Sequence, residues 1–337
     1  MSAPPPLGKH LASSDKSTRD KAVNGLTAFL CHESNARLSD KDMAKLWKGI
    51  FYCFWMSDKP LVQQALATDL SNIILAIPTL DASFAFLGGF WEAMVREWDG
   101  LDRYRLDKFY MLIRRYVNAT FRLLMREQWA ESPCSSVNDI LTRAKGPLYP
   151  HDVGVPKGLT YHLADIYLEE LNKVLFTVQE EELAPSLPKI IDPFLRLASE
   201  TSNDAIFARI NKGVLRPLLS ALRKASPSYT TTSTSDPRRA RKRPRMEKGS
   251  HRSEDDEDQA EDKSEADADA PLYFVVRKSR GFFSDGNESS KALPPKDLLE
   301  SVLKAIFDAA SRDTSKDSRR RRLYALWKSA KANQDDV

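Results

Sequence analysis

The stretch LDRYRLDKFYMLIRRYVNATFRLLMREQ, residues 101–128, contains no glycine or proline and keeps one apolar period throughout. At about 100° per residue, one face collects Leu106, Phe109, Ile113, Val117, Phe121 and Leu124. The opposite face carries what we call the basic stripe: Lys108, Arg115, Arg122 and Arg126. The pattern predicts a long central helix of roughly seven or eight turns, with one buried face and one basic face.

A second set of charges lies on the flank of this helix. Asp107 follows Arg103 by four residues and precedes Arg114 by seven. One carboxylate could therefore bridge two guanidinium groups. We expect Arg103, Asp107 and Arg114 to form a structural ion-pair cluster that holds the helix against its neighbours.

The same apolar period recurs on both sides of the central stretch, and no segment alternates with the period of a half-buried strand. Further helices are expected over 17–33, 40–56, 60–76, 80–98, 158–178, 186–199 and 202–224, with a short one near 136–144. The Gly88–Gly89 pair inside one of them indicates a close backbone approach or a bend. Residues 17–225 are thus predicted to be an all-α helical-repeat solenoid of HEAT or armadillo type, with a globular bundle as the competing architecture.

Composition divides the chain into four parts. Residues 1–16 are expected to be a flexible arm, 17–225 the repeat domain, and 226–270 a disordered basic and acidic linker. Residues 271–337 form a tail with short docking segments: PLYFVVRK (271–278) as a docking strand, a helix over 296–310, and a basic helix over 316–332. The fold prediction is therefore a helical solenoid followed by a disordered charged tail.

The charge balance and the cysteines restrict the class of protein. The net charge is +4, but the charges of residues 226–337 are sorted into blocks, which is typical of interaction tails. Three cysteines without a CxxC motif do not predict a disulfide framework and favour a reducing compartment. No signal peptide or membrane-spanning stretch is expected.

No catalytic signature is present in the sequence. The five histidines form no HxxxH or HExxH pair, and there is neither a phosphate-binding glycine loop nor a GxSxG motif. The carboxylates are interpreted as solvated helix charges and the cysteines as small buried apolar residues. We therefore expect no enzyme, no metal site, no cofactor and no small-molecule substrate.

Three basic sets are the candidates for binding. The basic stripe is either a solvated helix face, alone or salt-bridged to a neighbouring helix, or a contact for RNA or an acidic protein. A dense basic block in the linker has the form of a nuclear localisation signal: Arg238, Arg239, Arg241, Lys242, Arg243 and Arg245. The tail helix, through Arg319, Arg320, Arg321, Arg322 and Trp327, could bind RNA by phosphate contact and stacking, or serve as an amphipathic docking helix.

Three segments together resemble a known family. LWKGIFYCFWMSDKPLVQQALA (46–67), LDRYRLDKFYMLIRRYV (101–117) and VPKGLTYHLADIYLEEL (155–171) are similar to the nucleolar ribosomal RNA processing protein 1 family, a Nop-type nucleolar family. The resemblance covers roughly residues 18–222. It implies a helical-repeat, non-enzymatic protein of the nucleus and nucleolus. Such a protein associates with precursors of the large ribosomal subunit and is needed for pre-rRNA processing.

The resemblance also implies the partners, which are other large-subunit assembly factors and pre-rRNA within the pre-ribosome, with no membrane. It does not identify the residues that contact RNA. The alternative hypothesis is a nuclear adaptor for transport or chromatin built on the same solenoid. Such an adaptor would need an acidic, Trp- and Asn-lined groove, whereas residues 1–225 are nearly neutral, with 28 Lys/Arg and 26 Asp/Glu.

Overall fold

A computed structural model of the chain describes residues 10–11, 13, 15–32, 38–152, 154–177, 183–226, 272–282 and 291–335. Within these ranges the chain is helical, and the one β-type feature is an isolated bridge between Ser186 and Arg280. The all-α prediction is confirmed.

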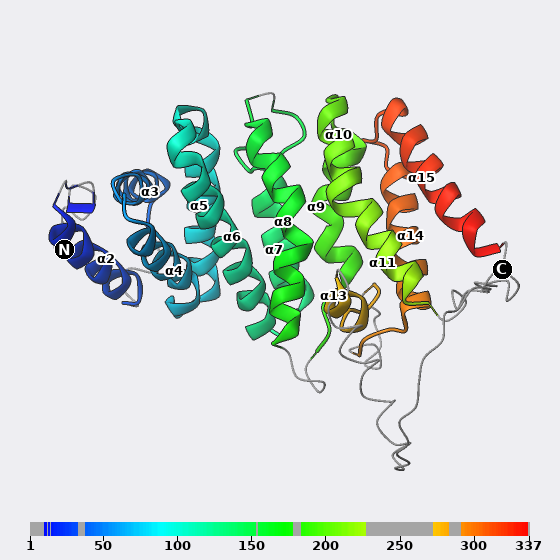
Figure 1. Ribbon diagram of the computed structural model, residues 1–337, viewed down its shortest axis with the longest axis horizontal. Helices are drawn as coiled ribbons and strands as arrows, with labels where there is room; N and C mark the ends of the chain where they lie inside the picture. The colour runs from blue at the N-terminus through cyan, green and yellow to red at the C-terminus, as the bar shows by residue number, and fades with distance from the viewer. Residues whose placement is uncertain are drawn as a thin grey trace, which may run out of the picture.

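The helices stack in chain order along the long axis of the molecule, with the N-terminus at one end and the C-terminus at the other (Figure 1). Up to residue 226, the described α-helices are α2 (Lys16–Leu30), α3 (Asp40–Trp55), α4 (Pro60–Ala76), α5 (Leu80–Glu97), α6 (Arg103–Arg126), α7 (Glu131–Thr142), α8 (Lys157–Phe176), α9 (Leu187–Glu200), α10 (Asp204–Ile210) and α11 (Arg216–Lys224). A short 3-10 turn, η2 (Trp98–Gly100), precedes α6, and a π-helical turn, η3 (Asn211–Leu215), joins α10 to α11. The remaining helices are α13 (Tyr273–Arg277), α14 (Pro295–Ser311) and α15 (Asp317–Asp335).

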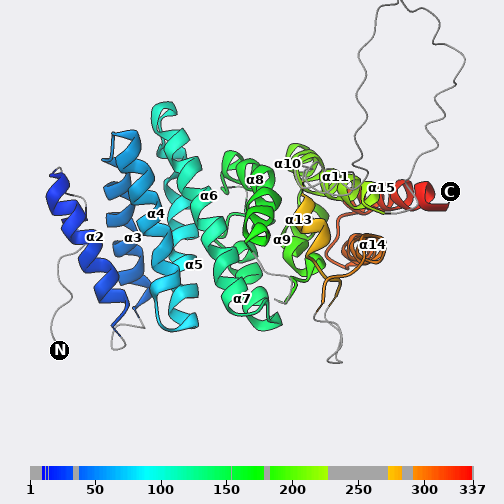
Figure 2. The ribbon, with the colours of Figure 1, turned by 60° about the horizontal axis from the view of Figure 1, so that its bottom comes forward.

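Two layers account for the elongated shape. In the first layer, helices α3, α5, α7, α9 and α14 pack on one another in succession. The second layer lies beside it and consists of α4, α6 and α8, followed by α10, η3 and α11. Figure 2 shows the same succession from a second direction. Each helix contacts its neighbours in the stack rather than a common centre, which is the arrangement of helical-repeat proteins and differs from a globular bundle.

Helix α6 is the central member of its layer. The Asp102 carboxylate caps its start by accepting from the Tyr104 and Arg105 amides, at 3.0 and 3.1 Å. Its inner face is buried as predicted, including Phe109 and Ile113. Tyr116, also on that face, donates its hydroxyl to the carbonyl of Leu70 in α4 at 2.7 Å. Burial against α4 and α8 therefore positions every side chain of the basic stripe.

The Gly88–Gly89 pair marks a close approach, as the sequence predicted. The indole of Trp47 in α3 lies against α5 so closely that a Cβ on Gly89 would be 2.3 Å from Trp47 Cδ1. The same indole donates from Nε1 to the Phe86 carbonyl at 3.0 Å and contacts the rings of Phe86 and Phe90. Gly89 is thus required by the packing of α3 on α5.

The predicted boundary at residue 226 is wrong as an end of the fold. Helix α14 packs on α9 and α11, and α15 packs on α14, so both belong to the stack. The expected docking strand at 271–278 is instead helix α13, which packs on α8. The physical reason is that α9 leaves an apolar face that the stripe of α14 covers, through Leu298, Val302 and Ile306.

Two smaller differences concern boundaries. Helix α7 begins at Glu131, five residues before the expected start, because its Pro133 lies in the first turn, where proline is tolerated. The arm predicted over 1–16 includes Leu11, which is fully buried, while residues 1–9 lie outside the described ranges. None of the described helices is long and apolar enough to cross a membrane.

Candidate nucleic-acid interface

Lys108 does not belong to an exposed basic face. Its side chain is 6% exposed, and Nζ donates to the carbonyls of Trp55 and Ser57, both at 2.7 Å. Burial lowers the pKa of this ammonium to about 8, with the Asp58 carboxylate acting in the opposite direction. The expectation of an exposed Lys108 is wrong because the link between α3 and α4 crosses over this turn of α6.

Replacing Lys108 with methionine is expected to lower the free energy of unfolding by about 1–3 kcal/mol, because the two carbonyls lose a donor. The folded pKa lies below the ordinary value of 10.5, so between about pH 8 and pH 10 the unfolded chain binds more protons than the folded one. The free energy of unfolding of the wild type should therefore rise with pH in this window relative to K108M. Urea unfolding of both proteins measures this difference, and parallel pH curves would contradict it.

The other three members of the basic stripe are exposed, and two of them bond to α4. Arg122 donates from Nη1 to Asn72 Oδ1 at 3.1 Å, and Arg126 donates from Nη1 to the Leu75 carbonyl at 2.9 Å. Arg115 makes no hydrogen bond or ion pair within the described residues. The stripe therefore works partly as a seam between α4 and α6.

The predicted ion-pair cluster is also different. Arg114 Nη1 lies 2.7 Å from carboxylate oxygens of both Glu169 and Glu170 on α8, while Asp107 and Arg103 are exposed and form no ion pair within the described ranges. Asp107 is two turns away along α6, about 10 Å, which is too far for a direct ion pair. Arg114 therefore holds α6 against a neighbouring helix, as expected, but through the carboxylates of α8.

The strongest concentration of positive charge lies at the C-terminal end of the stack. Residues 204–226 and 317–332, which contain α10, η3, α11 and most of α15, hold eleven Lys/Arg and two Asp/Glu. Figures 1 and 2 show α11 and α15 side by side at this end, beside α14. A molecule with a net charge of only +4 therefore has one strongly basic end.

Two arginines of the predicted tail site are structural. Arg319 is 2% exposed and donates to the carbonyls of Thr201 and Ser202, at 2.8 and 2.9 Å, and to Asp204 Oδ1 at 2.6 Å. Arg320 donates to the Ala310 carbonyl at the end of α14. Arg319 fixes α15 on the corner between α9 and α10, and Arg320 fixes it on the end of α14, so both guanidinium groups are engaged within the fold.

The other three residues of that predicted set lie at the surface or near it. Arg321 is exposed, and Arg322 is exposed with Nη1 2.7 Å from Asp204 Oδ1. The guanidinium of Arg322 also lies over the Phe207 ring, 5.5 Å from its centroid. Trp327 is half-buried and packs on Phe307 of α14, at 5.3 Å between ring centroids.

A groove of about 610 Å³, which we call the basic groove, separates α11 from α15. Its basic rim consists of Arg216, Arg223 and Lys224 on α11 and Arg322 on α15. Its floor is apolar and includes Phe207, Leu219, Leu326 and Ala330. No Asp or Glu is among the described residues that line it.

The cations of the rim form few hydrogen bonds or ion pairs with the described part of the chain. Arg223 donates from Nη2 to the Ser329 carbonyl at 3.4 Å, and its buried Nε has no hydrogen-bond partner in the described structure. Arg216 and Lys224 are exposed and form no ion pair with a described residue. Four cations around an apolar floor suit a polyanion with flat apolar groups, because guanidinium forks bind phosphate and bases contact apolar surfaces.

The sequence contained a signal for this groove that the prediction missed. Arg216, Arg223 and Lys224 recur at intervals of seven and eight, so they share one face of a helix. The second wall comes from α15, about one hundred residues later in the chain, and only the folded structure brings the two together.

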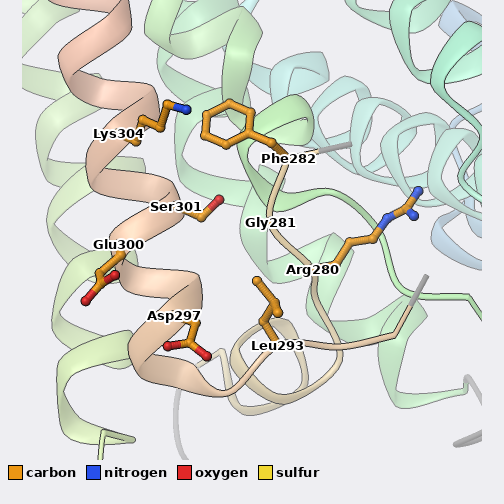
Figure 3. Close-up of a pocket in the computed structure, with 8 residues that line it drawn as sticks. All are labelled: Arg280, Gly281, Phe282, Leu293, Asp297, Glu300, Ser301 and Lys304. Carbon is orange, nitrogen blue, oxygen red and sulfur yellow. The ribbon is translucent and has the colours of Figure 1, made fainter. Parts of the chain in front are cut away.

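A second hollow is less suited to a polyanion. It lies between residues 280–282 and α14 and is lined by Arg280, Lys304, Asp297 and Glu300, so its charges balance (Figure 3). Figure 3 shows the Arg280 side chain pointing away from α14. No group of three or more His, Cys, Asp or Glu residues placed to hold a metal ion occurs within the described ranges.

The predicted nuclear localisation signal, Arg238 to Arg245, lies outside the described residues, as does the acidic part of the predicted linker, residues 254–269, which holds ten Asp/Glu. The assignment of that signal stays a prediction. The exposed binding candidates are therefore the basic groove and the remaining arginines of the basic stripe.

Comparison with known proteins places these features in a family context. A family model described as "Nucleolar protein, Nop52" matches residues 2–327, which includes α13, α14 and most of α15. Ribosomal RNA processing protein 1 homolog B of Mus musculus is 39% identical over 216 residues, covering 63% of this chain and 29% of that protein. Homolog A of Homo sapiens is 36% identical over 216 residues, covering 63% of this chain and 46% of that protein. The Dictyostelium discoideum homolog is 28% identical over 229 residues, covering 63% of this chain and 45% of that protein. The chain thus spans less than half the length of these relatives.

Proposed function

Because the chain belongs to the Nop52 family of nucleolar proteins, we propose that it acts in the nucleolus in the processing of ribosomal RNA. The relatives named ribosomal RNA processing protein 1 support this role. The family matched is the one that the sequence motifs at 46–67, 101–117 and 155–171 indicated.

In the finer form of the proposal, the protein is a non-enzymatic scaffold on precursors of the large ribosomal subunit. The helix stack offers a long surface to other assembly factors, and its basic end binds pre-rRNA. The observation that carries the RNA contact is the basic groove, where four cations surround an apolar floor and Arg322 alone among them pairs with a described carboxylate, that of Asp204. Binding there would hold a fold of the pre-rRNA until nucleases or later factors act on it.

The alternative, a nuclear adaptor that binds basic peptide signals, is less favoured by the same observation. Such signals require an acidic groove, and the charge of the groove between α11 and α15 has the wrong sign.

Sedimentation of the tagged full chain on a sucrose gradient, with sequencing of RNA crosslinked to it, tests the proposal. We expect co-migration with large-subunit precursors, crosslinks to their rRNA, and release to the top of the gradient after RNase treatment. Migration as a free protein or a small complex, with no rRNA crosslinks, would contradict the proposal and favour the adaptor.

A further inference from the structure

The outer surface of α4 is unusual because it is almost uncharged. Among its 17 residues, Asp69 is the one charged side chain. The positions that point away from the core in its first turns are Pro60, Leu61, Gln64 and Ala65, all exposed, and Leu61 is 79% exposed. Exposed helix faces normally carry charges, so a bare apolar face of this kind marks an interaction site.

The apolar surface continues onto α6. Helices α4 and α6 run parallel and side by side, since Tyr116 bonds to Leu70 and Arg126 bonds to Leu75. Tyr104, in the first turn of α6, is 84% exposed, and Met56, just before α4, is 41% exposed. Three of the six large apolar side chains that are exposed in the described structure therefore gather at the same end of this helix pair.

The border of this surface carries both signs of charge, with Asp58 and Lys59 exposed directly before α4 and two arginines exposed farther along the seam. Arg115 and Arg122 are exposed on α6 along the seam with α4, and neither pairs with a carboxylate of the described chain. Two acidic side chains, Asp69 on α4 and Asp107 on α6, are also exposed nearby. Along the seam between α4 and α6, the apolar surface comes first and the two arginines follow it. A ligand that lies along the seam and covers the apolar part therefore reaches the guanidinium groups.

We propose that this surface, which we call the α4–α6 surface and define by Met56, Leu61, Ala65, Tyr104, Arg115 and Arg122, is a docking site for an amphipathic helix of a protein partner. The partner helix places aliphatic residues on Leu61 and Tyr104 and a carboxylate edge on the two arginines. The apolar centre favours a protein over RNA, because only two of the six defining residues are cationic and both lie to one side. This inference rests on the proposed contact between the helix stack and other assembly factors and deepens it, since it assigns the surface that a protein partner contacts and the chemistry of the contacting segment.

Site-specific photocrosslinking tests the proposal in the full chain. A benzoylphenylalanine is introduced at position 61 or 104, and at position 176 as a matched control. Phe176 is 67% exposed on α8, at a distance from the α4–α6 surface. After irradiation in cells, mass spectrometry identifies the crosslinked peptide. We expect one dominant partner segment at positions 61 and 104, with apolar residues at helical spacing and an excess of Asp and Glu, at least tenfold above the yield of that segment at position 176.

Two variants then examine the chemistry. Leu61→Asp should abolish the crosslink from position 104, and the protein should still fold, because an acidic residue is favourable in the first turn of a helix. The pair Arg115→Glu and Arg122→Glu should reduce the crosslink at least tenfold, whereas Phe176→Asp should leave it unchanged. Thermal unfolding verifies that each variant is folded.

Crosslinks at positions 61 and 104 mainly to RNA, to basic segments, or to no defined segment would overturn the proposal. An unchanged crosslink in a folded Leu61→Asp protein would do the same. Each of these outcomes is independent of sedimentation with pre-ribosomal particles, so the docking site and the role in rRNA processing can fail separately.

Discussion

Trp47→Ala is expected to lower the free energy of unfolding by about 3–5 kcal/mol, the cost of removing a large aromatic side chain from a closely packed core. Trp47 is 1% exposed and joins α3 to α5 and α6 through ring contacts with Phe86, Phe90 and Tyr116. Its indole also supplies a donor to the Phe86 carbonyl, which the variant loses. Chemical unfolding followed by circular dichroism measures the change.

A double-mutant cycle with Gly89 makes this prediction more specific. Gly89→Ala alone should cost about 1–3 kcal/mol, because the new methyl would be 2.3 Å from Trp47 Cδ1 and the hydrogen-bonded indole cannot move away freely. In the Trp47→Ala background the same methyl occupies space that the indole has left, although Met43 Cγ remains close at 2.9 Å. The cost of Gly89→Ala should then fall below half of its value in the wild type. If Gly89→Ala lowers the free energy of unfolding equally in both backgrounds, the packing of Trp47 does not require a glycine at position 89.

The double variant Arg216→Glu and Lys224→Glu should weaken binding of a uridine-rich single-stranded RNA by roughly 10- to 100-fold at about 0.1 M salt. Both side chains are exposed on the rim of the basic groove, so their replacement changes the charge without disturbing the core. Each lost phosphate contact should also reduce the salt slope by about 0.7, so the logarithm of affinity should depend less steeply on the logarithm of salt concentration. Fluorescence anisotropy over a salt series gives both quantities.

A control variant with the same change in net charge separates the groove from the overall charge. Lys41→Glu and Lys48→Glu alter two exposed lysines of α3, at the other end of the stack. They should change the affinity less than about threefold. An equal loss of affinity in both double variants would mean that RNA binding follows total charge, and it would remove the basic groove as the site.

The prediction from sequence was most accurate where local signals agree. Helix α4 was placed at its observed bounds, 60–76, because proline is favoured in the first turn of a helix, where Pro60 lies, and Pro78 follows its end. The place of α14 was missed because an apolar stripe looks the same in sequence whether the chain itself or a partner covers it. The change of composition at residue 226 does not end the array, because α13, α14 and α15 pack on the stack after it.

The candidate site was harder to predict, for reasons that individual residues illustrate. The helical wheel of α6 correctly places Lys108 opposite the core face, but it cannot show that the ammonium bonds to two carbonyls, Trp55 at the end of α3 and Ser57 in the link to α4. Arg319 and Arg322 are equivalent in a run of four arginines, yet one is buried in a corner of the fold and the other is exposed. The wall formed by Arg216 and Lys224 becomes a groove only when α15 packs opposite it.

The unequal charge of the two ends gives the molecule a preferred orientation in an electric field. Residues 15–102 hold nine Lys/Arg and twelve Asp/Glu. The segments 204–226 and 317–332 together hold eleven Lys/Arg and two Asp/Glu. An elongated body with this distribution has a dipole along its axis, and a polyanion turns such a body before the two make contact. The C-terminal end should therefore arrive first, at a rate that falls as ionic strength rises. The α4–α6 surface would then face outward, where a second molecule can reach it after the first has been bound.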